Sequence, residues 1–387
     1  MPSRLRIARN ILANWSGLTA STLVSFLLAP YILHKLGDAG YGVWMLALSL
    51  TGYLGLLDLG IRSSVIRFVS SHRAKSEYGS LNQIFNTALL TFSSIGLLAF
   101  LIGVAIALSA DKLFNIPPEL TGQAQGVIIL ISAMLALNFV SGVFSSILAA
   151  AERFDLVNFN TLTSSLFRAG LILLIFPFKA DLVTLGAVTL VSSLFYLLNI
   201  YFAFRHEPNL KLDFKLADRQ TLRKIFNYSA FSFIIIISSR VAYYSDNTVI
   251  GIFGTAEMIT YFAIGGIIVE FLRRFVNAFS TVIMPVASVL DSQEQNASLE
   301  RLLLAGTKYS LLAILPLSLI LASMGKTLLS VWMGPVYAEK SYIILLILLL
   351  PQIYNLSQFA AEEILLGISR HKFFSIIALT EALSNLV

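Results

Sequence analysis

Three ionisable residues interrupt an apolar stretch that is long enough to cross a bilayer. Asp58, Arg62 and Arg67 lie in segment 41–68, YGVWMLALSLTGYLGLLDLGIRSSVIRF, and a spanning helix needs only about 20 apolar residues. An ionised group at that depth costs roughly 2.5–3.5 kcal/mol, so it is expected to face protein or water. We therefore predict that this segment forms the wall of a polar, substrate-binding cavity.

The spacing of these residues leaves a structural alternative open. Asp58 and Arg62 are four residues apart and share one helix face, so they can form an intrahelical ion pair. Arg67 lies nearer the end of the span and can extend its guanidinium to the membrane surface. In the functional interpretation, the arginines instead form a cationic site for an anionic substrate.

Two later apolar stretches carry similar groups. Arg240 and Asp246 lie within FIIIISSRVAYYSDNTVIGIF, among serine, tyrosine and asparagine residues. Glu270, Arg273 and Arg274 stand at i, i+3 and i+4 of the next stretch, so one arginine can neutralise the carboxylate and leave the other for a ligand. Both clusters are predicted to line the cavity.

The charge inside the membrane is predominantly positive, which indicates a phosphate or diphosphate ligand. Guanidinium groups bind phosphate through two hydrogen bonds and do not lose their proton. The candidate substrate-binding residues are Arg62, Arg67, Arg240, Arg273 and Arg274. The candidates for coupling to protons or sodium are Asp58, Asp246 and Glu270.

Motifs for catalysis and for metal binding are missing from the sequence. It has no GxSxG, GxxxxGK[ST] or HExxH, which argues against hydrolase chemistry and ATP hydrolysis. With no cysteine and four scattered histidines, neither a metal site nor a bound cofactor is expected. A transporter is predicted rather than an enzyme.

The elements that must position these residues are membrane-spanning helices. Of the 387 residues, 57% are hydrophobic and 12% are charged, about half the charged fraction of a soluble domain. The apolar runs are too long and too continuous for barrel strands, which alternate over about ten residues. The sequence therefore predicts an all-α integral membrane protein.

Eleven spans are expected, and the last is interrupted by the end of the chain. They cover 11–35, 41–70, 81–109, 123–150, 156–178, 181–204, 226–252, 256–286, 303–327, 341–366 and 372–387. With the N-terminus in the cytoplasm, 15 lysines and arginines of the loops fall on the inner side and 5 on the outer side. The net charge of +6 is therefore attributed to topology and not to nucleic-acid binding.

The spans fall into two lobes, 1–204 and 226–387. Between them lies a polar linker, 205–225, whose second half is either an amphipathic helix at the membrane surface or part of a solvated connector. In the first case, Leu212, Phe214 and either Leu216 or Leu222 would face the lipid. The linker is predicted to lie in the cytoplasm.

A constant offset of 217 residues relates the two lobes. It places Gly37 on Gly254 and Pro118 on Pro335, and it also superimposes spans 81–109 and 123–150 on later spans. An even number of spans separates the halves, so they are predicted to be parallel repeats about an axis along the membrane normal. The offset also predicts spans beyond Val387, so we expect the second lobe to be truncated in this chain.

The N-terminal run NWSGLTASTLVSFLLAPYILHKLGDAGYGVWMLALSLTGYLGLLDLGIRSSVIRFVS resembles the polysaccharide-biosynthesis flippases of the Wzx type. These form the polysaccharide transporter family of the multidrug/oligosaccharidyl-lipid/polysaccharide exporter superfamily. The resemblance covers residues 10–75 and is carried by an LG-x-x-x-YG-x-W turn and a GLLDLG segment. The residues concerned are Leu36, Gly37, Tyr41, Gly42, Trp44 and Gly55–Gly60.

This resemblance implies a MATE-like fold of two six-helix lobes around a central cavity that works by alternating access. The implied substrate is an oligosaccharide on undecaprenyl diphosphate, flipped across the bacterial plasma membrane for O-antigen, capsule or exopolysaccharide assembly. Cavity arginines would engage the diphosphate, with Arg62, Arg240 and Arg273 or Arg274 on comparable spans. Polysaccharide polymerase machinery is an implied partner.

Three other functions are weighed against this one. A multidrug or metabolite antiporter of the same superfamily would need a carboxylate-rich cavity for cations, whereas arginines predominate here. A lipid II flippase would normally be longer, with an extra helix pair. A non-transporting membrane scaffold would not need arginines within its spans, so tolerance of their substitution distinguishes it.

Overall fold

The computed structural model describes the backbone of residues 4–280, 283–368, 376 and 380. Side chains are described for the same residues except 4–20, 227–236, 238–244, 277–280 and 285. The described residues form α-helices and short 3-10 turns, with no strand among them. The predicted all-α fold class is confirmed, while the last predicted span, 372–387, lies almost wholly outside the described residues.

Six stretches of the described chain are long and apolar enough, by length and composition, to cross a membrane. They are Ser21–Asp58, Tyr78–Leu108, Pro118–Ala150, Leu182–His206, Asn296–Trp332 and Pro335–Gly367. Large apolar side chains face outward along the helices, and Leu101, Leu108 and Leu174 are 55%, 66% and 65% exposed. An apolar exterior of this kind suits lipid and not water, so the chain is a multi-pass membrane protein.

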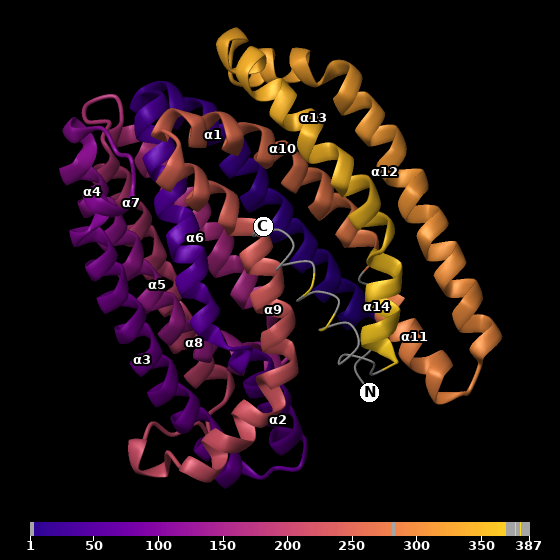
Figure 1. The fold of residues 1–387 in the computed structure, drawn as a ribbon. Helices are drawn as coiled ribbons and strands as arrows, with labels where there is room; N and C mark the ends of the chain where they lie inside the picture. The colour runs from indigo at the N-terminus through magenta and orange to yellow at the C-terminus, as the bar shows by residue number, and fades with distance from the viewer. Residues whose placement is uncertain (1–3, 281–282, 369–375, 377–379, 381–387) are drawn as a thin grey trace. The chain divides into compact units, whose positions relative to one another are not determined.

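The chain divides after Ala256 into two compact units, which are described separately. The first contains α1 (Arg4–Leu54), η1 (Gly55–Asp58), α2 (Ile61–Ala74), α3 (Tyr78–Leu108), α4 (Ala110–Leu113), η2 (Pro118–Leu120), α5 (Thr121–Ala150), α6 (Phe154–Ile175), α7 (Leu182–Ser193), η3 (Leu194–Leu197), α8 (Leu198–His206), η4 (Phe214–Leu216) and α9 (Arg219–Phe253). Helix α5 packs between α3 and α7, and α1 packs against α6 and α9 (Figure 1). Because α9 also contacts α2 and α3, its contacts assign it to this first unit.

Two breaks interrupt the N-terminal helices. Gly37 has φ 72° and ψ 173°, so it kinks α1 between the first and second predicted spans. The second span, 41–70, is expected to be one helix, but it passes through the 3-10 turn η1 and then through two left-handed residues, Leu59 (φ 53°) and Gly60 (φ 72°), before α2 begins. Glycine adopts this conformation without steric cost, which allows the chain to restart as a new helix.

Aromatic packing fixes α2, α3 and α5 around this second break. The Phe92 and Phe139 ring centroids are 5.9 Å apart, and those of Phe85 and Phe144 are 5.5 Å apart, all within one buried cluster. Ile61 joins this cluster from the first residue of α2. Close backbone approach supports the packing, since a side chain at Gly103 of α3 would overlap Ser132 of α5.

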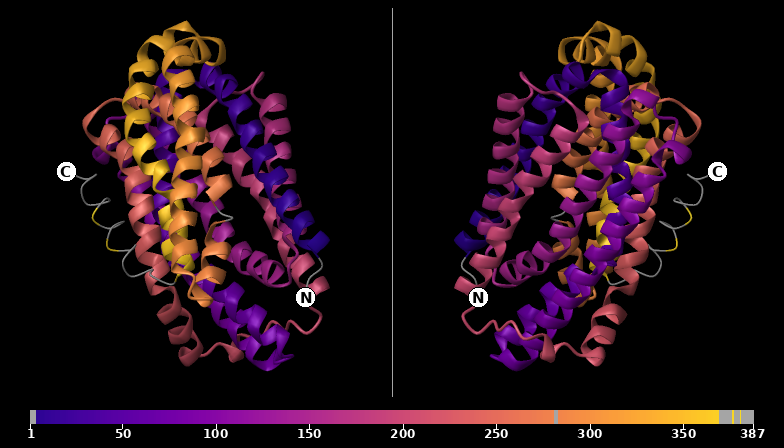
Figure 2. Two further views of the ribbon diagram at one scale, coloured as in Figure 1. Left: turned by 90° about the vertical axis from the view of Figure 1, so that its right-hand side faces the viewer. Right: turned by 90° about the vertical axis from the view of Figure 1, so that its left-hand side faces the viewer.

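The second unit contains α10 (Ala256–Ser280), α11 (Ile283–Ser292), α12 (Asn296–Trp332), α13 (Pro335–Ser357) and α14 (Phe359–Gly367). Helices α12 and α13 run side by side in both sets of views (Figures 1 and 2), and α11 packs on α14. The order of elements follows the predicted offset. Gly37 and Gly254 each stand between two helical segments, and Pro118 and Pro335 each open a helical segment.

Candidate functional site

The second break carries the first predicted pair of charged residues. Arg62 Nε lies 2.6 Å from Asp58 Oδ2, although Asp58 ends η1 and Arg62 belongs to α2. The Arg62 side chain is 39% exposed and that of Asp58 is 20% exposed. The alternative interpretation, an ion pair between these residues, is therefore observed, and it holds together the two sides of a helix break.

Three further groups hold the Arg62 guanidinium. Arg62 Nη2 donates to the Asn138 carbonyl at 3.0 Å, and Cζ lies 5.9 Å from the centroid of the Phe92 ring. Gly142 completes the cradle, because a Cβ at this position would overlap the guanidinium. Arg62 Nε is buried and forms no hydrogen bond with the described residues, so its contact with Asp58 is an ion pair without hydrogen-bond geometry.

The position of Arg62 follows from the amphipathic pattern of α2. Ile61, Ser64, Val65 and Val69 are buried on one side of this helix, as the i, i+3, i+4 spacing predicts. Arg62 therefore lies at the edge of the buried face, where its side chain reaches α5. A guanidinium has five N–H donors, and the 39% exposure of this side chain leaves part of the group accessible from outside the protein.

The other two candidates of the first unit lie on α2 and α9. Arg67 is exposed on α2, in keeping with a side chain directed outward. Arg240 lies on α9, and its side chain falls outside the described residues. Their predicted role in substrate binding stays a prediction.

A second polar cluster joins α1 to α9 within the first unit. Asn247 Nδ2 donates to Ser49 Oγ at 3.0 Å, and Tyr53 shares a side-chain hydrogen bond with Thr248. Asp246 is half-buried and lies close enough to Tyr53 to interact with it electrostatically. The structure thus places this predicted coupling carboxylate beside hydroxyl groups of the first helix.

The second unit carries the third predicted cluster on α10. Arg274 Nε donates to Glu270 Oε1 at 2.9 Å, and their side chains are 47% and 21% exposed. Arg273 is half-buried on the same helix. Of the two arginines, Arg274 is therefore the one that forms this salt bridge with the carboxylate.

Two polar contacts between helices of the first unit lie outside the three predicted clusters. Arg168 of α6 is half-buried and donates to Ser25 Oγ of α1 at 3.3 Å. Asn160 of α6 donates to Asn199 Oδ1 of α8 at 2.7 Å, and Asn199 donates to Ser141 Oγ of α5 at 3.2 Å. The sequence shows a polar residue within each of three apolar spans. Such residues are expected to be buried, but the sequence does not show which of them pair.

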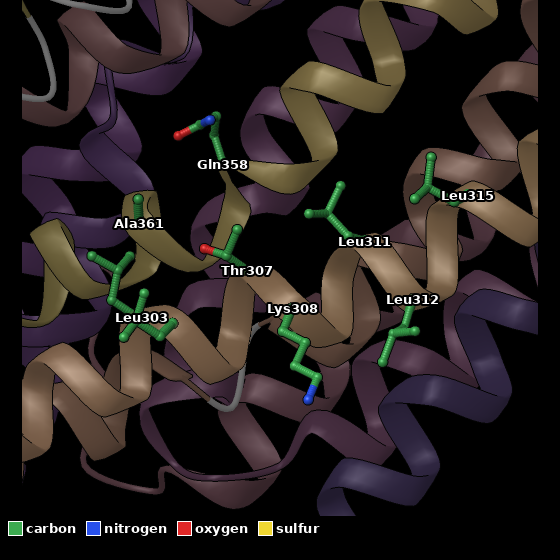
Figure 3. Close-up of a pocket in the computed structure, with 9 residues that line it drawn as sticks. Leu303, Thr307, Lys308, Leu311, Leu312, Leu315, Gln358 and Ala361 are labelled. Atoms are coloured by element: carbon green, nitrogen blue, oxygen red, sulfur yellow. The ribbon is translucent and has the colours of Figure 1, made fainter.

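The second unit also carries a groove of about 600 Å³ along α12. Its walls are mostly leucines of α12, with Lys308, Thr307 and Gln358 supplying the polar atoms (Figure 3). Among the described residues, no group of three or more histidine, aspartate or glutamate side chains is placed to bind a metal ion.

Outside the spans, acidic side chains are held in the charged state by local donors. The hydrogen bond from His72, at 2.6 Å, is the main cause that lowers the pKa of Glu77 at the start of α3. The backbone N–H of Thr221 is the main cause that lowers the pKa of Asp218 at the start of α9. Both groups stabilise helix N-termini, where a negative charge is favourable.

The family model described as polysaccharide biosynthesis protein matches residues 7–290. A Shigella flexneri protein to which O-antigen transport is ascribed is 23% identical over 358 residues, which cover 91% of this chain and 82% of that protein.

Solved structures with the same fold include MATE transporters and a further transporter of the MOP superfamily. An inward-facing multidrug resistance MATE family transporter of the MOP superfamily has a TM-score of 0.79 at 14% identity, over 96% of this chain and 88% of that one. A MATE transporter of Vibrio cholerae has a TM-score of 0.67 at 15% identity, over 97% and 86%. A MOP superfamily transporter of Pyrococcus furiosus has a TM-score of 0.63 at 17% identity, over 97% and 84%. At such identities the likeness establishes a MATE-like fold and nothing about the ligand.

Proposed function

This chain belongs to the polysaccharide biosynthesis protein family, and from this premise we propose that it flips an undecaprenyl-diphosphate-linked oligosaccharide across a bacterial plasma membrane. The family membership agrees with the resemblance predicted from the N-terminal run. The proposed product is an oligosaccharide unit in the outer leaflet, where a polysaccharide polymerase would use it. The proposed activity is translocation, in which no covalent bond of the substrate changes.

The observation that supports this proposal best is the state of Arg62. Its guanidinium lies at a break in a spanning segment, is 39% exposed, and is held from three sides by Asp58, Asn138 and Phe92. A fixed guanidinium can bind a diphosphate through paired hydrogen bonds without a large loss of side-chain entropy. Arg67, Arg240, Arg273 and Arg274 are the further candidates for this contact.

Orientation follows from the distribution of basic residues. With the N-terminus in the cytoplasm, 15 basic loop residues lie inside and 5 outside, as expected for a plasma-membrane protein. The lipid-linked substrate would then enter from the cytoplasmic leaflet and leave in the outer one. The MATE-like fold is compatible with alternating access as the means of transfer.

Coupling to an ion gradient is proposed to use the carboxylates beside the arginines and hydroxyls. Asp58 and Glu270 are each paired with an arginine, and Asp246 lies near Tyr53. A proton or sodium ion that neutralises one of these carboxylates would change the charge of its neighbourhood and thereby the affinity for the diphosphate.

The test is complementation in a strain that lacks its own flippase. Wild type, Arg62→Ala and Arg62→Lys would be compared at matched membrane expression, with Arg205→Ala as control, because Arg205 is exposed and bonds Tyr201 Oη at 2.8 Å. We expect Arg62→Ala to lose surface polysaccharide and to accumulate lipid-linked units, whereas the control keeps wild-type levels. Normal surface polymer with Arg62→Ala would overturn the assignment of Arg62, and failure of wild type to complement any such strain would overturn the function.

A further inference from the structure

The segment between α8 and α9 is bound along its backbone by two asparagines of α3. Asn82 Nδ2 donates to the Asn209 carbonyl at 2.9 Å, and Asn82 Oδ1 accepts from the Lys211 N–H at 2.7 Å. Asn86 Nδ2 donates to the Lys211 carbonyl at 2.8 Å, and Asn86 Oδ1 accepts from the Asp213 N–H at 2.9 Å. Each side-chain amide therefore pairs with the chain as a neighbouring strand would.

The spacing of the two asparagines explains why this pairing is in register. Four helical residues rise by about 6 Å, and two residues of an extended chain span about 6.6 Å. Asn82 and Asn86 are four apart on α3, and the residues they bind, 209, 211 and 213, are two apart. Both asparagine side chains are buried, so these hydrogen bonds belong to the packed interior and not to the protein surface.

Both ends of the segment are also fixed. At its start, the buried Glu207 carboxylate accepts from Arg73 Nε at 2.8 Å, and at its end the Asp218 N–H donates to Thr87 Oγ1 at 3.1 Å. We call residues 207–218 the strap; it joins α8 to α9 at the lower edge of the first unit in Figure 1. Because it is docked from end to end, the strap presents its outward side chains in fixed positions. The strap is thus not a solvated connector, whereas the second half of the predicted linker is helical from Arg219 onward, as the first turns of α9. That Leu212 and Phe214 face the lipid stays a prediction.

Two large apolar side chains point away from the protein on this strap. Leu212 is 55% exposed and Phe214 is 52% exposed, while Leu210 between the asparagine contacts is buried. Leaving an exposed leucine and phenylalanine side by side in water is unfavourable, and the strap directly follows a spanning helix. These side chains are thus placed to enter the boundary between headgroups and acyl chains.

Basic residues precede and follow these apolar side chains in the sequence. Lys211, Lys215, Arg219 and Arg223 are exposed, and Lys224 lies 4.8 Å from the Phe68 ring. The acidic residues of the same stretch are engaged locally. Glu207 pairs with Arg73, Asp213 accepts from the Lys215 N–H at 3.0 Å, and Asp218 accepts from the Thr221 N–H at 2.9 Å.

We propose that the strap and the start of α9 form a preformed membrane-surface anchor that binds anionic phospholipid headgroups through Lys211, Lys215 and Arg219 while Leu212 and Phe214 insert among the acyl chains. An anionic leaflet attracts basic residues near its surface, and apolar insertion adds to that attraction. Arg219, Arg223 and Lys224 of the first turns of α9 are also exposed, so the exposed basic residues of 211–224 outnumber the exposed Asp213 and Asp218. The charge of this stretch is therefore complementary to phosphate headgroups. This inference concerns the bilayer and does not depend on what the protein transports.

The absence of cysteine from the sequence permits a direct test with the full chain. Leu212→Cys, labelled with an environment-sensitive fluorophore, is reconstituted in nanodiscs of phosphatidylcholine with or without phosphatidylglycerol. Gln293→Cys, in the exposed turn before α12, is the matched control. We expect the label at 212 to report an apolar environment and quenching by spin-labelled lipid in anionic discs at low salt, and the control label to report water.

A second variant tests the headgroup contact without altering the label. Lys211→Gln/Lys215→Gln should weaken binding of phosphatidylglycerol roughly fivefold per lysine removed, whereas Lys35→Gln/Lys112→Gln, with the same loss of charge, should not. A label at 212 that reports water in anionic discs would overturn the anchor. Equal insertion with and without phosphatidylglycerol would overturn the role of the anionic headgroup.

Discussion

Arg62 Nε lies 2.6 Å from Asp58 Oδ2 across the point where the second span leaves helical geometry. Between the two residues the chain passes through Leu59 and Gly60, both with positive φ. The 3-10 turn and α2 would otherwise be joined by a flexible link. The ion pair, the Asn138 carbonyl and the Phe92 ring together fix the direction in which α2 continues.

A double-mutant cycle should show that the two sides of the break are energetically coupled. Asp58→Ala and Arg62→Ala each leave a partly buried charge unpaired, so each should destabilise the protein by about 1–2 kcal/mol. The double variant should be less destabilised than the sum, with a coupling of roughly 0.5–3 kcal/mol. Unfolding in detergent micelles measures all four proteins, and a coupling near zero would show that the pair does not hold the break.

The cradle of Arg62 predicts a different effect for two glycines of the same helix. Gly142→Ala should displace the Arg62 guanidinium, because the new Cβ would occupy its place, whereas a Cβ at Gly122 meets no neighbouring atom. In a helix interior, alanine is favoured over glycine by about 1 kcal/mol; Gly122 is the second residue of α5, so this preference applies to it only in part. We therefore expect Gly122→Ala to be neutral or stabilising and Gly142→Ala to lower both stability and surface polysaccharide. Equal behaviour of the two variants would contradict the cradle.

Removal of the strap's amide contacts should expose it to protease. Lys211, Lys215 and Arg219 are trypsin sites within or next to the strap, and Asn82→Ala/Asn86→Ala deletes four hydrogen bonds that protect it. Each unpaired buried polar group costs about 1–3 kcal/mol, so cleavage should accelerate roughly tenfold or more. Gln83→Ala, on the exposed side of α3, is the control. Unchanged cleavage of the double variant would show that the strap is held by other contacts.

The N-terminal cap of α9 should make stability depend on pH. Backbone N–H groups, chiefly that of Thr221, lower the pKa of Asp218 below its ordinary 3.8. The folded state thus binds fewer protons than the unfolded one, so the contribution is complete above the ordinary pKa and is lost as the pH falls through the lower folded pKa.

Three proteins can be compared by thermal unfolding at pH 7, 5 and 3. Asp218→Ala should be less stable than wild type at pH 7 and pH 5, and this difference should shrink at pH 3. Asp218→Asn should keep a cap that does not titrate, because the amide oxygen accepts the same hydrogen bond. A difference between wild type and Asp218→Ala that stays constant over this range would show that the ionised carboxylate is not what caps α9.

The spacing of charged residues in the sequence predicted the two ion pairs, whereas the other contacts of each pair depend on tertiary packing. Glu270 and Arg274 are four residues apart on one helix, so a helical pattern was sufficient to bring them together. Asp58 and Arg62 have the same spacing, but they pair across the break at Leu59 and Gly60 and not within one helix. Asn138 stands 76 residues from Arg62, and no pattern in either segment reveals that α5 supplies its carbonyl to α2. The all-α class follows from the composition, the family from the N-terminal motifs and the repeat from a constant offset. All three are local or periodic properties of the sequence.

The helix break and the strap show why some local predictions were incomplete. Gly55 and Gly60 permit bending, but glycines also serve close packing, so their presence did not predict the break at Leu59. The composition of the polar linker was compatible with a solvated connector. The groups that bind its backbone, Asn82 and Asn86, lie more than a hundred residues away and could not be identified from the linker itself. Polar side chains on α3 gave no indication of which backbone they would bind.

The Glu270–Arg274 pair predicts how a carboxylate limits the binding of a diphosphate. Arg274 is 47% exposed but is bonded to Glu270 at 2.9 Å, so an anionic ligand must compete with that carboxylate. Glu270→Gln removes the competing charge, and a partly exposed pair of this kind is worth about 0.2–1 kcal/mol. Affinity for undecaprenyl diphosphate in detergent should therefore rise by up to about fivefold, whereas Glu257→Gln, in the first turn of the same helix, should leave it unchanged. If Glu270→Gln instead weakens binding, the carboxylate positions the arginine for the ligand rather than competing with it.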